Sequence, residues 1–319
     1  MMRKPTTILL LVLSLAATCC KIAPHEVDKR RAPANVNANA NTSPGRPSLQ
    51  PQLMQIASLA KGRVGVHAMV LETGETVGSL NSRDHFPMQS VYKLPISMAV
   101  LKQVDEGKLK LNQTVRIAKE DYIGPAAHSP IRDKYPQGAD LTVDQLLRYA
   151  LTESDGTASD VLMKLAGGNA IVQSYVTDLP VTDLIVLNTE KELSEDATAQ
   201  YRNYASPESA VALLRALFEG RGLSEAAKAL LTKYMIESKP GAKRLKGLLP
   251  AEAVVAHKTG TSGTDKGMTA ATNDIGIITL PGGKHLAIAV FVSDSPADEE
   301  TREGVIAKLA KTIYDAAGG

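Results

Sequence analysis

The sequence is poor in cysteine: both of its cysteines, Cys19 and Cys20, lie near the amino terminus of a 319-residue chain. The part of the chain that follows has no thiol, which excludes disulfide bridges and a cysteine nucleophile there. Histidines are few and scattered, and none of the six stands four residues from another, as in a zinc-binding helix. We therefore expect no metal and no other cofactor.

Neither sign of charge dominates, since 36 lysines and arginines stand against 34 aspartates and glutamates, a formal net charge of +2. A field of that size does not favour nucleic acid or an anionic membrane surface. With 44% hydrophobic and 22% charged residues, the chain can bury a sizeable core as one large domain or two joined ones. No internal repeat is visible, so function must be inferred from individual sites.

The amino-terminal segment has the layout of a secretory signal, because two basic residues precede an apolar stretch, 8–17, that is too short to span a membrane comfortably. We predict a signal peptide over 1–20 and export to the periplasm; a buried amino-terminal helix is the alternative. The end of the segment has a loose likeness to a lipoprotein processing site, which leaves a lipid anchor at Cys19 or Cys20 open.

Residues 21–52 are polar, contain several prolines and an alternating Asn-Ala run, and lack apolar periodicity. This composition predicts a disordered linker. Such a spacer suits a protein held off a membrane by a lipid, and a frayed terminus explains it equally well. The folded domain is expected over 53–319.

Hydrophobic periodicity in that domain predicts strands near both ends of the chain and helices between them. After a short helix at 53–61, strands at 63–71 and 75–80 are expected to form a hairpin that turns at Thr73-Gly74. The remaining helices are expected at 90–106, 142–147, 157–165, 170–178, 207–218, 224–237 and 299–316, and the remaining strands at 254–258, 269–280 and 285–294.

This order favours an α+β fold, in which one antiparallel sheet is assembled from both ends of the chain and covered by the terminal helices. The α/β part would comprise about 53–85 and 240–319, and an all-α part would comprise about 86–239. A cleft between the two parts would be the natural site.

Ser90 and Lys93 stand three residues apart at the start of an expected helix, where positions i and i+3 share a face. A serine hydroxyl is a weak nucleophile, and an adjacent amine in a dry site can take its proton. The pattern is not specific, because Ser58 and Lys61 repeat it on an apparent surface helix. A helix-terminal serine beside a solvated lysine is the alternative.

Two further triplets place polar residues at the ends of expected helices or strands. The triplet 154–156, Ser-Asp-Gly, precedes a helix, where a simple N-cap is the alternative interpretation. The triplet 258–260, Lys-Thr-Gly, closes an apolar strand, where a lysine that protects an edge strand from aggregation is the alternative. The order Ser-x-x-Lys, Ser-Asp-x and Lys-Thr-Gly is typical of penicillin-recognising serine enzymes.

With these motifs the chain resembles the class A serine β-lactamases from about residue 53 to its end. The likeness is greatest to the PER and VEB extended-spectrum group, through the runs 200–207, 244–250, 254–263 and 270–274. The resemblance implies the β-lactamase/transpeptidase-like fold, with a five-stranded antiparallel sheet flanked by helices. It also implies a monomeric exported hydrolase that opens β-lactam antibiotics through an acyl-enzyme, confers resistance and needs no protein partner.

By that resemblance, Ser90 is the nucleophile, Lys93 its proton partner and Ser154 the hydroxyl that passes a proton to the lactam nitrogen. The backbone N–H groups of Ser90 and Thr261 would form the oxyanion hole. Glu190 resembles the general base that activates the deacylating water, whereas Glu192 is expected to be a solvated surface carboxylate.

The resemblance also assigns the substrate-binding residues. Lys258 and Thr259 would anchor the substrate carboxylate, with Gly260 letting the substrate approach the backbone. Arg244 would add a guanidinium for the same carboxylate.

The chain departs from the family pattern at four of these positions. Gly156 stands where an asparagine usually holds the substrate's side-chain carbonyl and hydrogen-bonds the lysine. Ser194 stands where an asparagine or histidine helps to hold the hydrolytic water, which a serine hydroxyl can still do. Asn188 replaces an arginine that pins the loop around Glu190, so this loop is expected to be built differently. His128 takes the place of the aromatic wall, where it can still stack on a substrate.

Two other functions stay open at this point. A D-alanyl-D-alanine carboxypeptidase or penicillin-binding protein shares the acylation residues but generally lacks a base like Glu190. An anchored β-lactam-binding sensor would be acylated without turnover.

Overall fold

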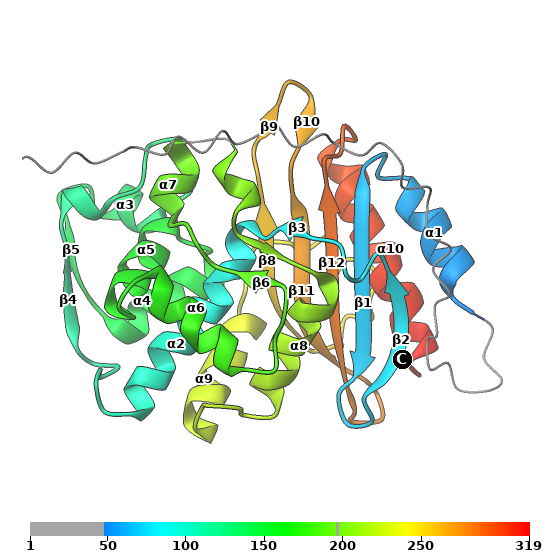
Figure 1. Cartoon of the computed structure of the whole chain (residues 1–319), viewed down its shortest axis with the longest axis horizontal. Helices are drawn as coiled ribbons and strands as arrows, with labels where there is room; N and C mark the ends of the chain where they lie inside the picture. Colours follow the sequence, from blue (N-terminus) through cyan, green and yellow to red (C-terminus); the bar gives the residue numbers. More distant parts are fainter. Residues whose placement is uncertain (1–47, 196–197) are drawn as a thin grey trace, which may run out of the picture. The chain divides into compact units, whose positions relative to one another are not determined.

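A five-stranded antiparallel sheet is the centre of the structure, a computed structural model that describes residues 48–195 and 198–319. The strand order β2-β1-β12-β11-β8 brings both ends of the chain into one sheet, as Figure 1 shows. The α+β fold predicted from the sequence is therefore confirmed. The strands are β1 (Arg63–Val70), β2 (Glu75–Leu80), β8 (Val255–Thr261), β11 (Thr272–Thr279) and β12 (His285–Ser293).

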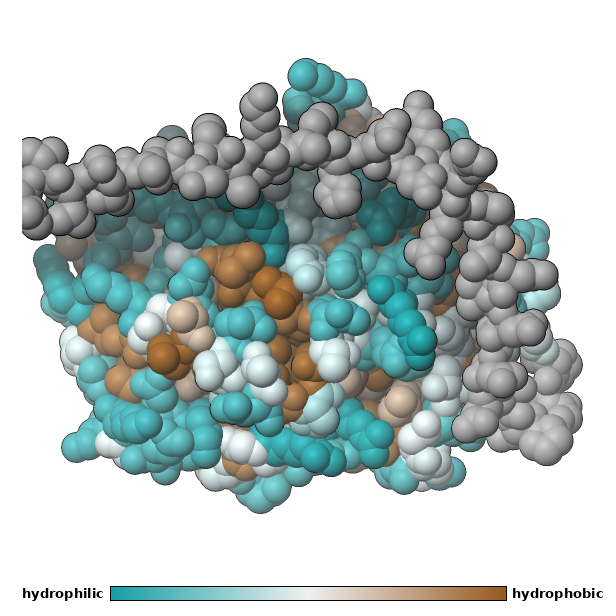
Figure 2. All heavy atoms as spheres, in the orientation of Figure 1, coloured by the Kyte–Doolittle hydropathy of each residue, from teal (hydrophilic) through white to brown (hydrophobic). Residues whose placement is uncertain are grey.

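The predicted signal peptide and lipidation site lie outside the described residues. None of the described helices is long and apolar enough to cross a membrane. The face seen in Figure 2 is mostly hydrophilic, with apolar residues gathered in separate patches.

The central strand β12 is apolar along nearly its whole length because both of its faces are covered. Its alternate residues belong to two different hydrophobic cores, as the two-residue period of a strand requires. Leu286, Ile288, Val290 and Val292 pack with helices α1 (Gln50–Ser58) and α10 (Glu299–Ala316). Ala287, Ala289 and Phe291 belong to the larger core on the side of the helical part.

The amino-terminal hairpin follows the prediction closely. β1 and β2 pair antiparallel, and Gly74 adopts a φ of +72° in the turn between them, a conformation that glycine reaches without steric cost. β1 pairs on its other side with β12, from Arg63 opposite Ser293 to Val70 opposite Leu286.

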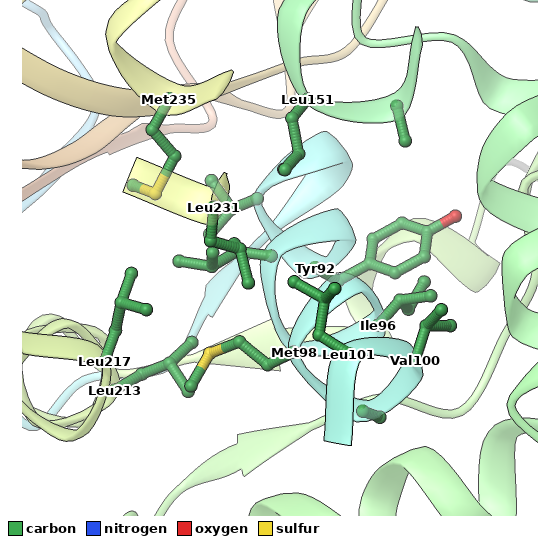
Figure 3. Close-up of a cluster of buried hydrophobic side chains, with 14 of the residues drawn as sticks. Tyr92, Ile96, Met98, Val100, Leu101, Leu151, Leu213, Leu217, Leu231 and Met235 are labelled. Carbon is green, nitrogen blue, oxygen red and sulfur yellow. The ribbon is translucent and has the colours of Figure 1, made fainter. Parts of the chain in front are cut away.

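The helical part is organised around α2 (Lys93–Asp105), whose first nine residues are all buried. A helix that is buried on every side belongs in a core, and Figure 3 shows its side chains near Leu151, Leu213 and Leu231, which belong to other helices. The longer helices of this part, besides α2, are α4 (Val143–Thr152), α5 (Gly156–Leu165), α6 (Asn169–Asp178), α8 (Pro207–Phe218) and α9 (Glu225–Ile236).

Several predicted boundaries were wrong. The first helix begins at Gln50, inside the predicted linker, and the helix expected at 90–106 begins as a 3-10 turn, η1 (Gln89–Tyr92). The helix expected to end at residue 147 continues to Thr152, and the strand expected from 269 is interrupted before Thr272.

The sequence prediction also missed the shortest elements, because their stability comes from distant partners rather than from their own pattern. β3 (Phe86–Pro87), for example, pairs with β7 (Tyr204–Ala205). The other missed elements are α3 (Pro130–Lys134), α7 (Glu190–Glu195), η2 (Lys119–Asp121), η3 (Ala199–Tyr201), β4 (Thr114–Ile117), β5 (Ala139–Thr142), β6 (Leu184–Ile185), β9 (Thr264–Asp265) and β10 (Met268–Thr269).

Candidate active site

Most residues singled out in the sequence meet in one cleft of about 600 Å³ between the helical part and strand β8. Gln89, Gln200 and Pro240 contribute to its walls. Four of the predicted residues, Lys258, Gly260, Arg244 and Gly156, lie behind the lining. The predicted residues that line the cleft are Ser90, Lys93, His128, Ser154, Glu190, Ser194, Thr259 and Thr261.

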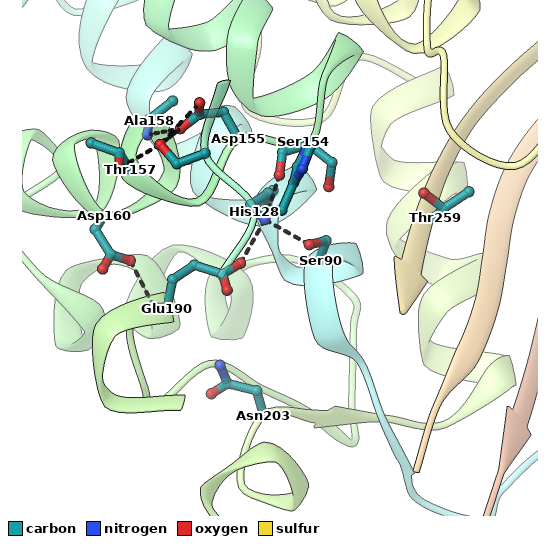
Figure 4. Close-up of polar contacts among 12 residues, drawn as sticks. Ser90, His128, Ser154, Asp155, Thr157, Ala158, Asp160, Glu190, Asn203 and Thr259 are labelled. Atoms are coloured by element: carbon teal, nitrogen blue, oxygen red, sulfur yellow. Dashed lines mark hydrogen bonds and ion pairs between the residues drawn. The ribbon is translucent and has the colours of Figure 1, made fainter. Parts of the chain in front are cut away.

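Lys93 is the centre of the polar contacts in this cleft. Its side chain is only 2% exposed, and its Nζ donates to Ser90 Oγ at 2.6 Å, to Glu190 Oε1 at 2.5 Å and to the Ser154 carbonyl at 3.1 Å. An ammonium has three hydrogens, so all of them are used. Figure 4 shows Ser90, Ser154 and Glu190 around this point, each from a different element.

The local backbone explains how Ser154 offers its carbonyl. Ser154 has a φ of +59°, and Asp155 after it is the N-cap of α5, with Oδ1 accepting from Ala158 N at 2.8 Å. The N-cap interpretation is thus correct for the aspartate of the triplet, while the serine lines the cleft. Burial raises the pKa of Asp155, and the N–H donors of Ile131 and Ala158 oppose that shift.

Gly156 lies against a side chain that occupies the room of a larger residue. A Cβ built on it would stand 2.3 Å from Ile123 Cδ1 and 3.3 Å from both Glu190 Cγ and the His128 carbonyl. The amide that the family usually carries at this position has no space here unless Ile123 moves.

Lys258 is fully buried and connects strand β8 to the helical part, because its Nζ donates to Ser154 Oγ at 2.9 Å and to the Thr259 carbonyl at 3.0 Å. Burial, together with the nearby charge of Lys93, lowers the pKa of Lys258 well below its ordinary value, while Asp274 and Glu190 oppose the shift. Gly260, two residues on, packs so tightly that a Cβ would lie 2.2 Å from the Met88 carbonyl.

Arg244 is placed behind Thr261 rather than in the cleft. The guanidinium is 4% exposed and donates to Thr261 Oγ1 at 2.8 Å, to the Asn273 carbonyl at 2.9 Å and to Glu303 Oε1 at 3.0 Å. Arg244 itself is not among the residues that line the cleft, whereas Thr261, its hydrogen-bond partner, is.

The two candidate glutamates differ in what they face. Glu190 begins α7 and contacts Lys93, whereas Glu192 Oε2 accepts from the Thr189 backbone N–H at 2.8 Å and closes the first turn of the same helix. That backbone hydrogen bond lowers the pKa of Glu192. Glu192 is thus a capping residue and not merely a solvated carboxylate.

Asp160, which sequence reasoning missed, holds the backbone of Glu190. Its Oδ1 accepts from Glu190 N at 2.7 Å and its Oδ2 from Lys191 N at 3.0 Å. Burial raises the pKa of Asp160 to about 7, against the effect of these two backbone donors. The available signal was its position four residues after Gly156, which puts both on one face of α5.

A buried amide, that of Asn203, closes the loop that carries Glu190. Asn203 Oδ1 accepts from Leu187 N at 2.7 Å and from Asn188 N at 2.8 Å, and its Nδ2 donates to the Asn188 carbonyl at 2.8 Å. Asn203 was also missed as a functional residue, although it lies within the run 200–207 that carries the family resemblance.

His128 and Ser194 are exposed, as is Thr261 at the end of β8. The His128 ring nitrogen Nε2 lies 2.9 Å from the Glu153 carbonyl, and Ser194 Oγ donates to the Lys191 carbonyl at 2.6 Å. The Ser194 oxygen keeps its acceptor capacity toward the cleft.

A serine hydroxyl that contacts a buried lysine, which in turn contacts a glutamate, is the arrangement of a serine hydrolase. Residues 48–317 match the family model described as "Beta-lactamase enzyme family". The chain is 43% identical over 275 residues to the extended-spectrum β-lactamase PER-1 of Pseudomonas aeruginosa, covering 86% of this chain and 88% of that protein. It is 37% identical over 282 residues to β-lactamase VEB-1 of the same organism, covering 88% and 92%.

Solved structures agree with these relatives. A β-lactamase from Chitinophaga pinensis DSM 2588 superposes with a TM-score of 0.82 at 48% identity, covering 84% of this chain and 98% of that one. The TLA-1 extended-spectrum β-lactamase superposes with a TM-score of 0.81 at 38% identity, covering 86% and 100%. The chain belongs to the β-lactamase enzyme family, as a serine β-lactamase of class A.

Proposed function

We propose that Ser90 attacks the carbonyl of a β-lactam antibiotic and that Glu190 activates the water that releases the acyl-enzyme. Hydrolysis of β-lactams, and with it antibiotic resistance, is the activity of class A serine β-lactamases. The observation that carries the assignment is the position of Lys93, whose Nζ lies 2.6 Å from Ser90 Oγ and 2.5 Å from Glu190 Oε1. One group thus joins the nucleophile to the base.

Acylation begins when the Lys93 ammonium passes a proton to Glu190. The neutral amine then takes the hydroxyl proton of Ser90 as Oγ bonds to the lactam carbonyl carbon. The backbone N–H groups of Ser90 and Thr261 stabilise the oxyanion. The carbon–nitrogen bond breaks, and the nitrogen takes a proton from Ser154 Oγ, which lies 2.9 Å from Lys258 Nζ. The Lys93 ammonium, which holds the Ser90 proton, then reprotonates Ser154 and becomes a neutral amine again.

Lys93 is the general base of acylation, and deacylation needs another base that acts on water. Glu190 takes this role after it has returned its proton to Lys93. Its carboxylate takes a proton from water, the resulting hydroxide attacks the ester carbonyl, and Ser90 Oγ leaves with a proton. Ser194 and His128 line the same cleft, where they can hold the water and the substrate side chain.

The substrate carboxylate binds at the end of the cleft formed by β8. Thr259 and Thr261 line it, the buried Lys258 supplies positive charge from behind, and Arg244 supports Thr261. Gly260 allows β8 to approach the segment before Ser90, which keeps the two oxyanion donors close to each other.

Nitrocefin turnover by the purified protein tests this assignment. We expect steady hydrolysis by the wild type and no adduct in Ser90→Ala. In Glu190→Gln, where Lys93 loses its proton acceptor and the water its base, we expect an acyl-enzyme that forms more slowly but is stable by intact-protein mass spectrometry. A burst of acylation without steady turnover in the wild type would favour a β-lactam sensor, and release of D-alanine from a peptide would favour a carboxypeptidase. Normal turnover in Glu190→Gln would contradict the choice of base.

We also propose that residues 1–20 direct export to the periplasm and that the catalytic domain beyond the linker acts as a monomer, with a lipid anchor at Cys19 or Cys20 as the alternative to an unlipidated exported protein. The charged and apolar layout of the first residues supports export. The intact mass of protein from the membrane fraction tests for the lipid, and an unlipidated mass would refute it.

A further inference from the structure

A buried carboxylate lies beneath the end of the cleft where the substrate carboxylate binds. Asp274 on β11 is fully buried and stands opposite Thr259 of β8, so the two residues share one face of the sheet. Both carboxylate oxygens lie 2.9 Å from His257 Nδ1, and Oδ2 also accepts from Leu245 N at 3.2 Å.

The two partners of Asp274 are the chain neighbours of the two cations at this end of the cleft. His257 immediately precedes Lys258, and Leu245 immediately follows Arg244. His257 is fully buried, and its Nε2 has no hydrogen-bond partner among the described residues. Since a carboxylate can only accept, His257 carries its proton on Nδ1, and Asp274 is its side-chain partner.

The charges around Lys258 leave it short of negative partners. The cations Lys93 and Arg244 disfavour its charged form, as does its own burial, and the carboxylates that favour the charge are Asp274 and Glu190. Of these two carboxylates, Asp274 has the larger effect in raising the pKa of Lys258. Glu190 is itself engaged by Lys93 at 2.5 Å, so Asp274 is the anion available to offset the Lys258 charge.

We propose that Asp274 is a positioning residue for recognition of the substrate carboxylate. Its charge keeps Lys258 cationic, and its bonds to His257 and Leu245 fix the two segments that carry Lys258 and Arg244. The inference rests on the proposed function, in which this end of the cleft binds the carboxylate. It implies that Asp274 matters for anionic β-lactams and not for the chemistry at Ser90.

The test is Asp274→Asn, assayed on a cephalosporin and on its carboxyl methyl ester. We expect KM for the acid to rise about tenfold while kcat changes less than twofold, and KM for the ester to stay within twofold. The basic limb of kcat/KM for the acid should move to lower pH, because the remaining charges disfavour the Lys258 cation. Asp265→Asn, at an exposed position on β9, is the matched control and should change none of these values.

A second variant separates position from charge. His257→Leu removes the bond that ties β8 to Asp274 but keeps the anion, so KM for the acid should rise while the basic limb stays in place. If Asp274→Asn fails to fold, this variant tests the positioning effect by itself.

These experiments separate the role of Asp274 from the binding of the substrate carboxylate at this end of the cleft. Equal effects of Asp274→Asn on acid and ester, or an unmoved basic limb, would overturn the role of Asp274, as would an unchanged acid KM in His257→Leu. A wild type that hydrolyses acid and ester with the same KM would instead show that this end of the cleft does not bind the carboxylate, and the proposed anchor would fail.

Discussion

Replacing Asp160 by asparagine should make the protein more stable and less active at the same time. Asparagine has the same shape as aspartate but only one acceptor oxygen. It can still accept from Glu190 N, which lies 2.7 Å from Asp160 Oδ1 in the wild type. Its amide N–H₂ would then face the Lys191 N–H, which now donates to Oδ2 at 3.0 Å. A hydrogen bond to a charged group contributes about 1.5–3 kcal/mol, so the start of α7 loses a strong restraint.

The stability effect follows from the pKa of Asp160, which burial raises from 3.8 to about 7. The unfolded chain releases this proton near pH 4 and the folded chain only near pH 7, so the wild type loses stability as pH rises between these values. This pKa difference corresponds to a loss of ~4 kcal/mol in the free energy of unfolding above pH 7. Since asparagine cannot ionise, we expect Asp160→Asn to have the higher Tm at pH 8 and no advantage at pH 4.

The activity should change in the opposite direction. A displacement of about 1 Å in a catalytic group can lower the rate by ~100-fold, and here the displaced group is Glu190. We expect kcat at pH 8 to fall at least tenfold while the acylation rate falls less, so that acyl-enzyme accumulates. The difference from the wild type should narrow as pH falls through about 7, because Asp160 then becomes neutral.

Thermal unfolding at pH 4 and pH 8, with stopped-flow acylation and steady-state hydrolysis, measures both effects. Asp265→Asn again serves as the exposed control. A variant that deacylates as fast as the wild type at pH 8 would refute the role of Asp160 in placing Glu190. A variant less stable than the wild type at pH 8 would show that the carboxylate stabilises the fold despite its burial.

Two further predictions concern the same wall and loop. Gly156→Asn should lower kcat/KM, because a Cβ at this position would lie 2.3 Å from Ile123 Cδ1. The double variant with Ile123→Ala should recover much of this loss. A kcat/KM that is higher in the single variant than in the double variant would contradict this. Asn203→Ala should lower the free energy of unfolding by about 1–3 kcal/mol, since it leaves partly buried backbone groups of Leu187 and Asn188 unpaired, and should lower kcat more than it changes KM. Urea unfolding of Asn203→Ala measures the loss of stability, with Asn112→Ala at an exposed position as the control. Equal urea midpoints for the two variants would contradict the predicted loss.

The fold was predictable where the local pattern is long and strong. The hairpin of β1 and β2 and the strand β12 each have enough alternating or continuous apolar residues to define a strand. The 3-10 turn at Gln89–Tyr92 was not predictable, because Gln89 takes a φ of +47°, a conformation that residues other than glycine rarely adopt. β3 has only two residues and depends on β7, far along the chain, so its sequence carries no pattern of its own.

The site was predictable where chemistry and spacing coincide, as in Ser90 with Lys93. Residues that act on the backbone were missed, because nothing in the sequence shows which N–H group a carboxylate or amide will face. Asp160, Asn203 and Asp274 are of this kind, and two of them lie within the runs that carry the family resemblance. Their position in the sequence was visible, but the groups they hold were not.

Glycine at position 156, where relatives usually have asparagine, should affect binding of the substrate side chain more than the reactivity of Ser90. Lys93 already uses its three hydrogens on Ser90, Glu190 and the Ser154 carbonyl, so it lacks no partner when the amide at 156 is absent. Ile123 fills the space behind Gly156, which closes the wall with an apolar group. A lactam side-chain carbonyl therefore loses a hydrogen-bond donor at this wall, while proton transfer from Ser90 keeps its geometry. Differences in substrate range from relatives with an asparagine here should appear in KM for side-chain variants rather than in the acylation rate of a common core.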